Sequence, residues 1–418
     1  MNSQTQSHRS RQLFLVLALS LIGVGNLIVP PSSGSSPLLD YLLLSLGLCG
    51  LIALYRLKTV IARLGIWLPG LGFVMLCIPG FLVTPINGYG VTKAQALLVV
   101  LILFFVCAAI QSPPAFMKRL TLITIITGTV FSLAAQSFGT LDVGGRLVFL
   151  GLNPIGIGRI TGLVLVMSLT LLFIKKASNY WTVIALVVVA AITTVGVVAT
   201  GSRGPLLSAA VACAGLIFLL SVTKKLSPRT AFLIALAATA AVGAVLLSDS
   251  TGLTRLATAT DSGRGELYAE TFRLALDNPQ GIGWGQLGQY IVDFRAIDEE
   301  SLYAHNVFLE ILVEGGVVAL LAFTVLLAGC IAQAWRAAKN NSWFVVNFVV
   351  LVYAVTSAQF SSDIVGNRLM WLYMALSLAA GSWVNRELRS QHEEIAPKNL
   401  AAKNRSETRK RQIIRGSN

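Results

Sequence analysis

Long apolar runs alternate with short polar segments along most of this chain. Twelve of the runs are long enough for a helix that crosses a bilayer, which needs about 17–25 residues. Their approximate centres are Leu21, Leu46, Phe73, Ile102, Ile125, Met167, Val188, Ala214, Ala238, Leu320, Val350 and Met374. The pattern predicts an all-α integral membrane protein with twelve transmembrane helices.

The first run follows a basic segment, so a cleaved signal peptide is the alternative to a membrane span. Its apolar part is longer than a signal core, and no clear small-x-small cleavage site follows it. We therefore interpret it as the first span. Composition agrees with a membrane class, because only 12% of the 418 residues are charged, whereas soluble domains carry about 25%.

The distribution of basic residues predicts the orientation. If both termini are cytoplasmic, 23 of the 32 Lys and Arg residues fall in inner loops and tails, as the positive-inside rule requires. The net charge of +14 then reflects topology and contact with anionic membrane lipids, and it is no sign of nucleic-acid binding. We expect a cytoplasmic tail over residues 1–11 and a disordered basic tail over residues 387–418.

A long outer loop separates the two groups of spans. Residues 12–248 are expected to hold helices one to nine, and residues 305–386 helices ten to twelve. The loop over 249–304 carries "GRGELYAETFRLALDN", which reads as an amphipathic helix capped by Asp261 or Ser262. A second such helix is predicted from the helical spacing of Leu287, Tyr290, Ile291, Phe294 and Ile297. Both helices are expected to roof an outer cavity that opens sideways to lipid.

Four arginines lie near the predicted outer surface, among glycine and apolar residues. They are Arg146, Arg159, Arg203 and Arg264. A guanidinium this close to hydrocarbon is costly without a partner. Snorkelling, or a salt bridge to Glu310, Glu314 or Asp363, would satisfy any one of them. A set on one face favours an anion site, because the rigid fork of arginine suits bidentate phosphate binding.

One histidine stands apart from the polar tails that hold His8 and His392. His305 lies in "YAHNVFLEILVEGG", residues 303–316, at the start of a predicted helix. Histidine titrates near neutral pH and suits proton acceptance, although a hydrogen bond to a loop carbonyl is the structural alternative. The same stretch contains Tyr303, Asn306, Glu310 and Glu314 as possible supporting residues. The two glutamates share a helix face and are expected to anchor arginines or orient the helix.

Glycines 281, 283 and 285 punctuate "NPQGIGWGQ". They permit close approach to another backbone or to a phosphate. The stretch does not match a nucleotide-binding loop, since no strand precedes it and no Gly-Lys-Ser follows. The five cysteines lie inside apolar runs without metal-type spacing, so we interpret them as small hydrophobic residues.

Three motifs occur in a fixed order: "TGSRGPLL", "SGRGELYAETFRLALDNPQGIGWGQ" and "YAHNVFLEILVEGGVVALLAF", within residues 200–323. Together they resemble the signature of the O-antigen ligase/polymerase superfamily of membrane glycosyltransferases. The first five spans are similar to that family only in hydropathy. The resemblance implies a fold like that of the GT-C glycosyltransferases and a metal-independent reaction without a cofactor.

The resemblance also implies substrates, and the reaction that it implies needs a base and fixed positive charge. The ligase branch moves O-antigen from undecaprenyl diphosphate to a sugar hydroxyl of lipid A–core, at the periplasmic face of the Gram-negative inner membrane. His305 would be the general base. Arg203 and Arg264 would bind the diphosphate, with Arg146 and Arg159 as weaker candidates.

Other functions stay open at this stage. A polymerase of the same superfamily would join O-units to one another, and a protein O-oligosaccharyltransferase would glycosylate a protein, although such enzymes tend to carry an added C-terminal domain. A small-anion transporter belongs to a different class. It should show internal repeats and discontinuous helices at the membrane midplane, and the hydropathy pattern reveals neither.

The orientation can be tested with reporter fusions to the full chain. A reporter placed after Ser250 should be active in the periplasm, and one placed after Asn340 should be active in the cytoplasm, because the basic loops stay inside. Alkaline phosphatase and a fluorescent protein report the two compartments. The reverse activities would contradict both the orientation and an outer active site.

Overall fold

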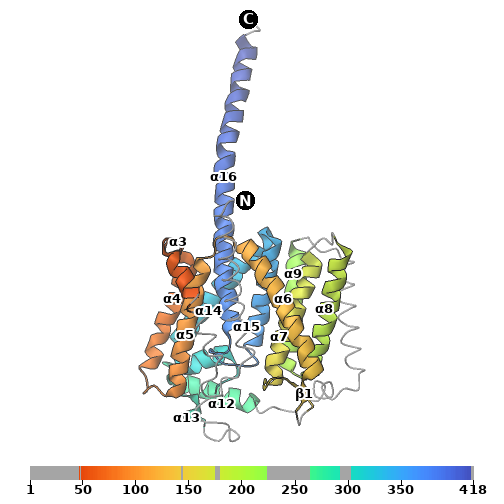
Figure 1. Ribbon diagram of the computed structural model, residues 1–418. Helices are drawn as coiled ribbons and strands as arrows, with labels where there is room; N and C mark the ends of the chain where they lie inside the picture. The colour runs from red at the N-terminus through yellow and green to blue at the C-terminus, as the bar shows by residue number, and fades with distance from the viewer. Residues whose placement is uncertain are drawn as a thin grey trace.

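The computed structural model describes residue 47 and residues 49–142, 145–174, 179–223, 264–291 and 303–415. These residues form a helical bundle (Figure 1). Its elements are α3 (Leu57–Ile61), α4 (Leu64–Cys77), η1 (Ile78–Phe81), α5 (Gly88–Ala108), α6 (Pro113–Phe138), β1 (Thr140–Leu141), β2 (Leu147–Val148), α7 (Pro154–Ile174), α8 (Tyr180–Ala199), α9 (Arg203–Val222), α12 (Arg264–Asp277), α13 (Leu287–Tyr290), α14 (Val307–Asn340), α15 (Ser342–Ser357) and α16 (Arg368–Arg415).

The membrane class is confirmed, and most of the predicted spans that fall on described residues are helices. Within the described part of the chain, seven helices are long and apolar enough to cross a membrane, and α15 is a shorter apolar helix. The seven are α4 with η1, then α5, α6, α7, α8, α9 and α14. The predicted last span is the buried first part of α16, over residues 369–384. The runs centred on Leu21 and Ala238 lie outside the described residues, so the count of twelve stays a prediction.

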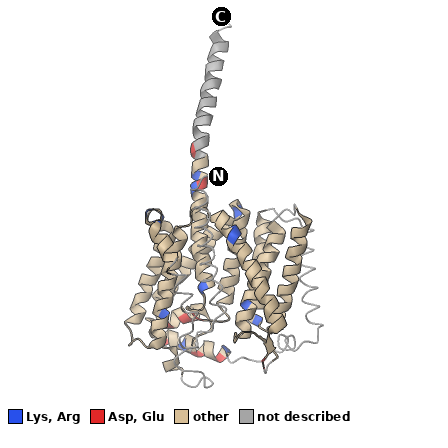
Figure 2. Ribbon diagram, viewed as in Figure 1, with Lys and Arg blue, Asp and Glu red and all other residues tan. Residues whose placement is uncertain are grey.

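Different elements lie at the two ends of the bundle. Helices α12 and α13 lie at one end, and α16 leaves the bundle at the opposite end (Figure 1). Charged residues gather near both ends, while the wall between them is mostly uncharged (Figure 2). This arrangement suits a bundle that spans hydrocarbon, because charge is tolerated at the two water-facing ends.

Arginines from the predicted inner loops cap a helix at the end opposite α12. The side chain of Arg56 donates to the carbonyl of Ala109 at 3.0 Å. That of Arg63 donates to the carbonyls of Ala108 and Ile110. The last carbonyls of α5 have no intrahelical partner, and cations are favourable at a helix C-terminus. These basic residues therefore supply partners for the carbonyls at the C-terminal end of α5.

Helix α14 is discontinuous at Gly316, whose φ of 78° and ψ of 178° are not helical. The break frees backbone groups that the segment 278–286 satisfies. Ile282 N and Gly283 N donate to the carbonyls of Val313 and Glu314 at 2.9 and 3.1 Å, and Val317 N donates to Pro279 O at 2.9 Å. Non-helical backbone at membrane depth is tolerated only where protein supplies such partners.

The glycines of this segment allow its close docking on α14 and the start of α5. Gly281, Gly283 and Gly285 have φ between 79° and 100°, which favours glycine. A Cβ at Gly281 would lie 2.5 Å from the carbonyl oxygen of Glu314, and one at Gly285 would lie 2.4 Å from the nitrogen of Gly90. Their use is backbone-to-backbone packing, one of the two alternatives that the sequence leaves open.

Four local expectations need correction. The second amphipathic helix is short, because α13 ends at Tyr290 and Ile291 leaves the helical conformation; the predicted continuation through Phe294 and Ile297 lies outside the described residues. The tail expected to be disordered is helical through Arg415, since Ala, Glu, Lys, Arg and Gln are strong helix formers. The hydropathy pattern reveals no discontinuous helix, whereas α14 is broken at Gly316. A two-stranded hairpin, β1 with β2, interrupts the all-α architecture.

The first predicted amphipathic helix corresponds to α12, which ends at Asp277. Its capping candidates, Asp261 and Ser262, lie outside the described residues. The helix buries Leu267, Thr271 and Ala275 and packs on α14.

The break in α14 can be tested with a matched pair of alanine substitutions. Gly316→Ala should lower the free energy of unfolding by roughly 1–3 kcal/mol, the usual cost of a strained residue, because the new Cβ would lie 2.5 Å from the carbonyl carbon of Gln280. Gly329→Ala on the same helix meets nothing within 4 Å and should be neutral or slightly stabilising. Thermal unfolding in detergent compares the two. Equal midpoints would contradict this account.

Candidate active site

The loop between α15 and α16, residues 358–367, is the point where the candidate site converges. Four side chains from distant elements bind it. Arg264 Nη1 donates to Phe360 O at 2.8 Å, Tyr268 OH to Gln359 O at 3.3 Å, Arg159 Nη2 to Asn367 Oδ1 at 2.7 Å and Tyr89 OH to Asp363 Oδ2 at 2.6 Å. The loop thereby joins α12, α7 and α5 at the end of the bundle that carries α12.

The same loop holds the start of α14, where His305 lies. Val307 N donates to Ala358 O at 3.1 Å. Asn306, predicted as a supporting residue, is the N-cap of α14: its side chain accepts from Phe308 N and Leu309 N at 3.0 and 3.2 Å. Its visible role is therefore to begin the helix. This cap fixes the residue that immediately follows His305 in the chain.

His305 has an unusual backbone and an unpartnered ring nitrogen. Its φ is 54°, an uncommon conformation for a residue with a side chain. Its ring lies 4.2 Å, centroid to centroid, from that of Tyr303, and its carbonyl accepts from Tyr268 OH at 3.4 Å. The Nδ1 atom is buried with no hydrogen-bond partner among the described residues. Backbone strain of this kind gathers at functional sites.

The environment of His305 keeps its imidazole neutral. Burial and, to a smaller extent, the charge of Arg264 lower its pKa to about 4, while the charge of Asp363 acts in the opposite direction. The pKa of this imidazole therefore lies below the near-neutral range in which histidine ordinarily titrates. The ring remains a proton acceptor across the physiological pH range.

Charged groups of both signs lie near the phenol of Tyr303. Burial, together with the charges of Asp363 and Glu310, raises the pKa of its phenol to about 12, while the charges of Arg264 and Arg159 act in the opposite direction. Two predicted arginines and two carboxylates thus act on one side chain. Arg159 and Arg264 thus lie close enough to Tyr303 to act on its phenol, and the ring of Tyr303 contacts that of His305.

Arg203 lies next to this group, at the first residue of α9. Its neighbour Gly204 packs against Phe360, with 2.9 Å from an added Cβ to Phe360 Cβ, and Gly158 packs against Pro205 in the same way. The N-terminus of α9 therefore contacts both the 358–367 loop and the helix that carries Arg159. The Arg203 side chain itself is exposed.

Arg146 has a local partner. It belongs to the β1–β2 hairpin, where its Nε lies 2.9 Å from Asp142 Oδ2. Of the four predicted arginines it has the clearest structural role, because the pair closes a turn.

Glu310 and Glu314 do not anchor arginines, contrary to expectation. Both carboxylates face the ammonium of Lys93 on α5, at 2.8 and 2.5 Å, and all three side chains are 0% exposed. An ammonium on a neighbouring helix is closer to these oxygens than any described arginine. The alternative role, orientation of the helix, remains open to both.

The residues that the sequence analysis missed are Lys93, Tyr89 and Asn367. Asp363 was considered only as a salt-bridge partner for an arginine, and it instead accepts from Tyr89 and from Gly366 N. A lysine five residues after the start of an apolar run is a recognisable signal, because such a residue needs a partner. The identity of the partner is not encoded locally.

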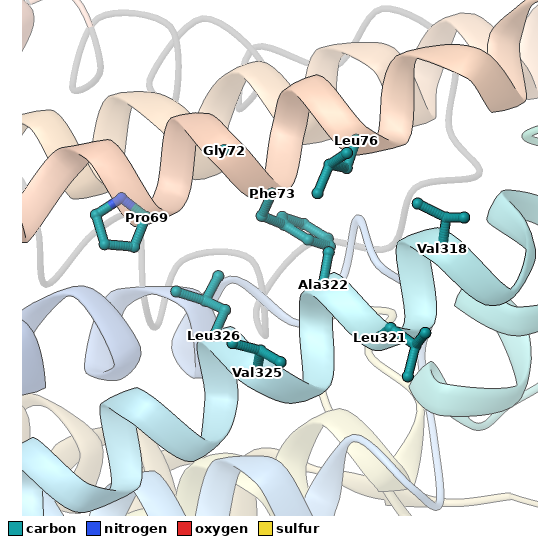
Figure 3. A pocket seen from close by; sticks show the side chains of 9 residues that line it. All are labelled: Pro69, Gly72, Phe73, Leu76, Val318, Leu321, Ala322, Val325 and Leu326. Atoms are coloured by element: carbon teal, nitrogen blue, oxygen red, sulfur yellow. The ribbon is translucent and has the colours of Figure 1, made fainter.

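An apolar groove lies elsewhere in the bundle. It occupies about 450 Å³ between α4 and α14 (Figure 3). Its lining is Pro69, Gly72, Phe73, Leu76, Val318, Leu321, Ala322, Val325 and Leu326. None of the candidate site residues lines it, so it is not the expected anion-binding cavity.

Comparison with known families adds an independent finding. Residues 188–324 match the family model described as O-antigen ligase. The matched segment runs from α8 into α14 and contains Arg203, Arg264 and His305, and it covers less than half of the chain. The resemblance to the O-antigen ligase superfamily is thereby confirmed. No curated protein matches the chain.

The family match and the helices together define a class. The chain is a multi-pass membrane protein whose matched segment is that of a ligase- or polymerase-type membrane glycosyltransferase. Within the O-antigen ligase family segment lie His305, both glutamates and two of the arginines. Arg159, Lys93 and the 358–367 loop lie outside it.

The state of His305 can be measured directly. In a His8→Gln/His392→Gln protein the only histidine ring is that of His305. Its ¹³Cε1 NMR shift should stay constant from pH 8 to about pH 5.5 and titrate near pH 4. Arg264→Gln removes a nearby positive charge that disfavours imidazolium, so the pKa should rise. A titration centred at 6–7 that ignores Arg264 would contradict this environment.

Proposed function

We propose that the chain is an O-antigen ligase, an inverting glycosyltransferase that takes a glycan from undecaprenyl diphosphate. The acceptor is a sugar hydroxyl of lipid A–core, and the reaction takes place at the periplasmic face of the inner membrane. The observation that carries the proposal is the placement of a strained His305 near Arg264, with Arg159 near the adjacent Tyr303, at one end of a membrane bundle.

The reaction needs a base and a binding site for a diphosphate. The acceptor oxygen attacks the anomeric carbon and forms the new glycosidic bond, while the bond from that carbon to the diphosphate oxygen breaks. The hydroxyl proton passes to His305, and the electron pair leaves with the lipid diphosphate. General-base help of this kind contributes typically about 10²–10⁴ in rate. Fixed positive charge where the leaving group gathers charge supplies the other part.

We assign the diphosphate to Arg264, Arg159 and Arg203. Arg159 is 4% exposed and has no ion pair within 4 Å among the described residues; its one side-chain hydrogen bond is to Asn367. A buried guanidinium without a counter-ion favours an anion. Arg146 already has Asp142, so we give it no substrate contact.

Donor binding would also raise the basicity of His305. The positive charge of Arg264 contributes to the low pKa of this imidazole. A diphosphate held by Arg264 compensates that charge, and a nearby negative charge favours imidazolium. The base then becomes effective when the donor is present. Without donor, the low pKa of His305 keeps its imidazole unprotonated.

The competing enzymatic functions predict different glycolipids after deletion of the gene. Deletion of a ligase gene leaves full-length polymer on the lipid carrier and bare lipid A–core. Deletion of a polymerase gene leaves single units attached to core. For a transporter, the discontinuity of α14 would have to hold an ion, whereas the freed groups of Val313, Glu314 and Val317 bond to segment 278–286.

The proposal predicts the behaviour of purified variants in nanodiscs. With an undecaprenyl diphosphate-linked donor and lipid A–core acceptor, His305→Ala should bind donor normally and lose about 10²–10⁴ in turnover. Arg264→Lys keeps charge but loses the fork, so donor binding should weaken, and Arg146→Lys is the matched control with little effect. Product on a gel and donor binding by thermophoresis report the two steps.

Two outcomes would overturn the assignment. If His305→Ala turns over at the native rate while Glu310→Gln or Glu314→Gln is inactive, a glutamate is the base. If Arg264→Lys and Arg146→Lys behave alike, the fork of Arg264 has no part in recognition of the diphosphate.

A further inference from the structure

A fully buried ion cluster lies at the junction of α5 and α14. Lys93 Nζ is 2.8 Å from Glu310 Oε1 and 2.5 Å from Glu314 Oε2, and the three side chains are 0% exposed. One ammonium therefore faces two carboxylates, which are one turn apart on α14. Such a cluster is rarely a source of stability, because desolvation offsets the attraction between the charges. The presence of this cluster therefore needs an explanation other than stability.

Each carboxylate also holds a backbone group of a separate segment. Glu310 Oε2 accepts from Ile364 N at 3.0 Å, and Glu314 Oε2 accepts from Gly285 N at 3.0 Å. The first bond reaches the 358–367 loop, and the second reaches segment 278–286. Both acceptors are oriented by the same ammonium.

Lys93 has a third connection to the loop. Its Nζ lies 4.6 Å from the ring centroid of Tyr89, a cation–π distance. The hydroxyl of Tyr89 donates to Asp363 Oδ2 at 2.6 Å. The ammonium thus connects to the 358–367 loop at both Asp363 and Ile364.

The two held segments control the position of Arg264 from both sides. The 358–367 loop supplies Phe360 O, the acceptor of its guanidinium. Segment 278–286 follows directly from α12, the helix that begins with Arg264. The loop also supplies Asn367 to Arg159. A shift of either segment would therefore move a guanidinium relative to His305.

We propose that Lys93 is a positioning residue: by pairing with Glu310 and Glu314 it fixes the spacing between the 358–367 loop and segment 278–286, and so the placement of Arg264 and Arg159. The catalytic part of this inference rests on the proposed function. The positional part does not, because it concerns two backbone amides. A misplacement of about 1 Å is enough to cost on the order of 10²-fold in rate.

The variants are chosen to avoid a trivial loss of folding. Lys93→Met alone leaves two carboxylates buried without a cation, which is strongly destabilising. The doubles Lys93→Met/Glu310→Gln and Lys93→Met/Glu314→Gln keep the formal charge of the native cluster, one negative charge. The singles Glu310→Gln and Glu314→Gln each leave one ammonium facing one carboxylate, and they form a matched pair.

Hydrogen exchange of the full-length protein in nanodiscs, read by mass spectrometry, gives the first measurement. Glu310→Gln should speed exchange at Ile364 and leave Gly285 protected, and Glu314→Gln should do the reverse. Both doubles should speed exchange at the two amides, with amides of α7 unchanged. Native exchange at both amides in the singles or the doubles overturns the proposal, and the result is independent of any enzymatic activity.

Transfer kinetics give the second measurement. In both doubles, and in both singles, the KM for the lipid-linked donor should rise about tenfold, with the KM for the acceptor unchanged. A loss of folded protein would lower the maximal rate and leave both KM values alone. Native donor KM in a folded double shows that Lys93 only compensates charge. If the doubles do not fold, the reciprocal exchange pattern of the singles decides. Absence of transfer by the native protein would refute the function and leave the exchange result standing.

Discussion

Hydrocarbon offers no hydrogen-bond partner, and the described structure depends on this constraint at one place above others. Helix α14 breaks at Gly316, and each unpaired backbone group there would cost several kcal/mol. Segment 278–286 supplies the missing partners. The break and the segment therefore exist only together. Because α12 precedes the segment directly, the same bonds hold α12 against the bundle and bring Arg264 to the 358–367 loop.

A second constraint acts on charge. Around the 358–367 loop the acids and cations divide into two sets. Lys93 holds the two glutamates, whereas Arg159 and Arg264 bond to neutral oxygens of the loop. The two glutamates are thus occupied by a lysine, Asp363 accepts from Tyr89 and from a backbone amide, and the two guanidiniums have no ion pair with these acids. This division is consistent with the anion site that we propose near His305, since an arginine paired with an internal acid has little capacity left to bind a ligand.

The sequence predicts the parts of this structure that depend on local pattern. Apolar runs locate the described spans because their length reflects the bilayer, the period of α12 follows from its amphipathic face, and the position of His305 follows from its isolation. What the sequence does not predict depends on long-range partners. Lys93 and Glu314 are 221 residues apart, and no local signal pairs them. Arg146 resembled the other arginines in its surroundings, yet Asp142 four residues earlier decides its role. The break in α14 is hidden because glycine pairs are common in membrane helices and the distant segment that permits it cannot be read from the run itself.

The separation of Lys93 from its carboxylates also has a consequence during synthesis. At roughly 5–20 residues per second, the 221 residues between Lys93 and Glu314 take roughly 10–40 seconds to make. Throughout that interval α5 carries an ammonium with no counter-ion. Lys93 is the sixth residue of α5, about 8 Å along the helix at 1.5 Å per residue, so its flexible stem can extend the charge to the headgroup region. The ammonium of a lysine at the middle of the same helix could not extend to the headgroup region in this way. The cluster is fully buried in the folded protein. Its lysine nevertheless lies close enough to the end of α5 for the ammonium to be hydrated until α14 has been synthesised.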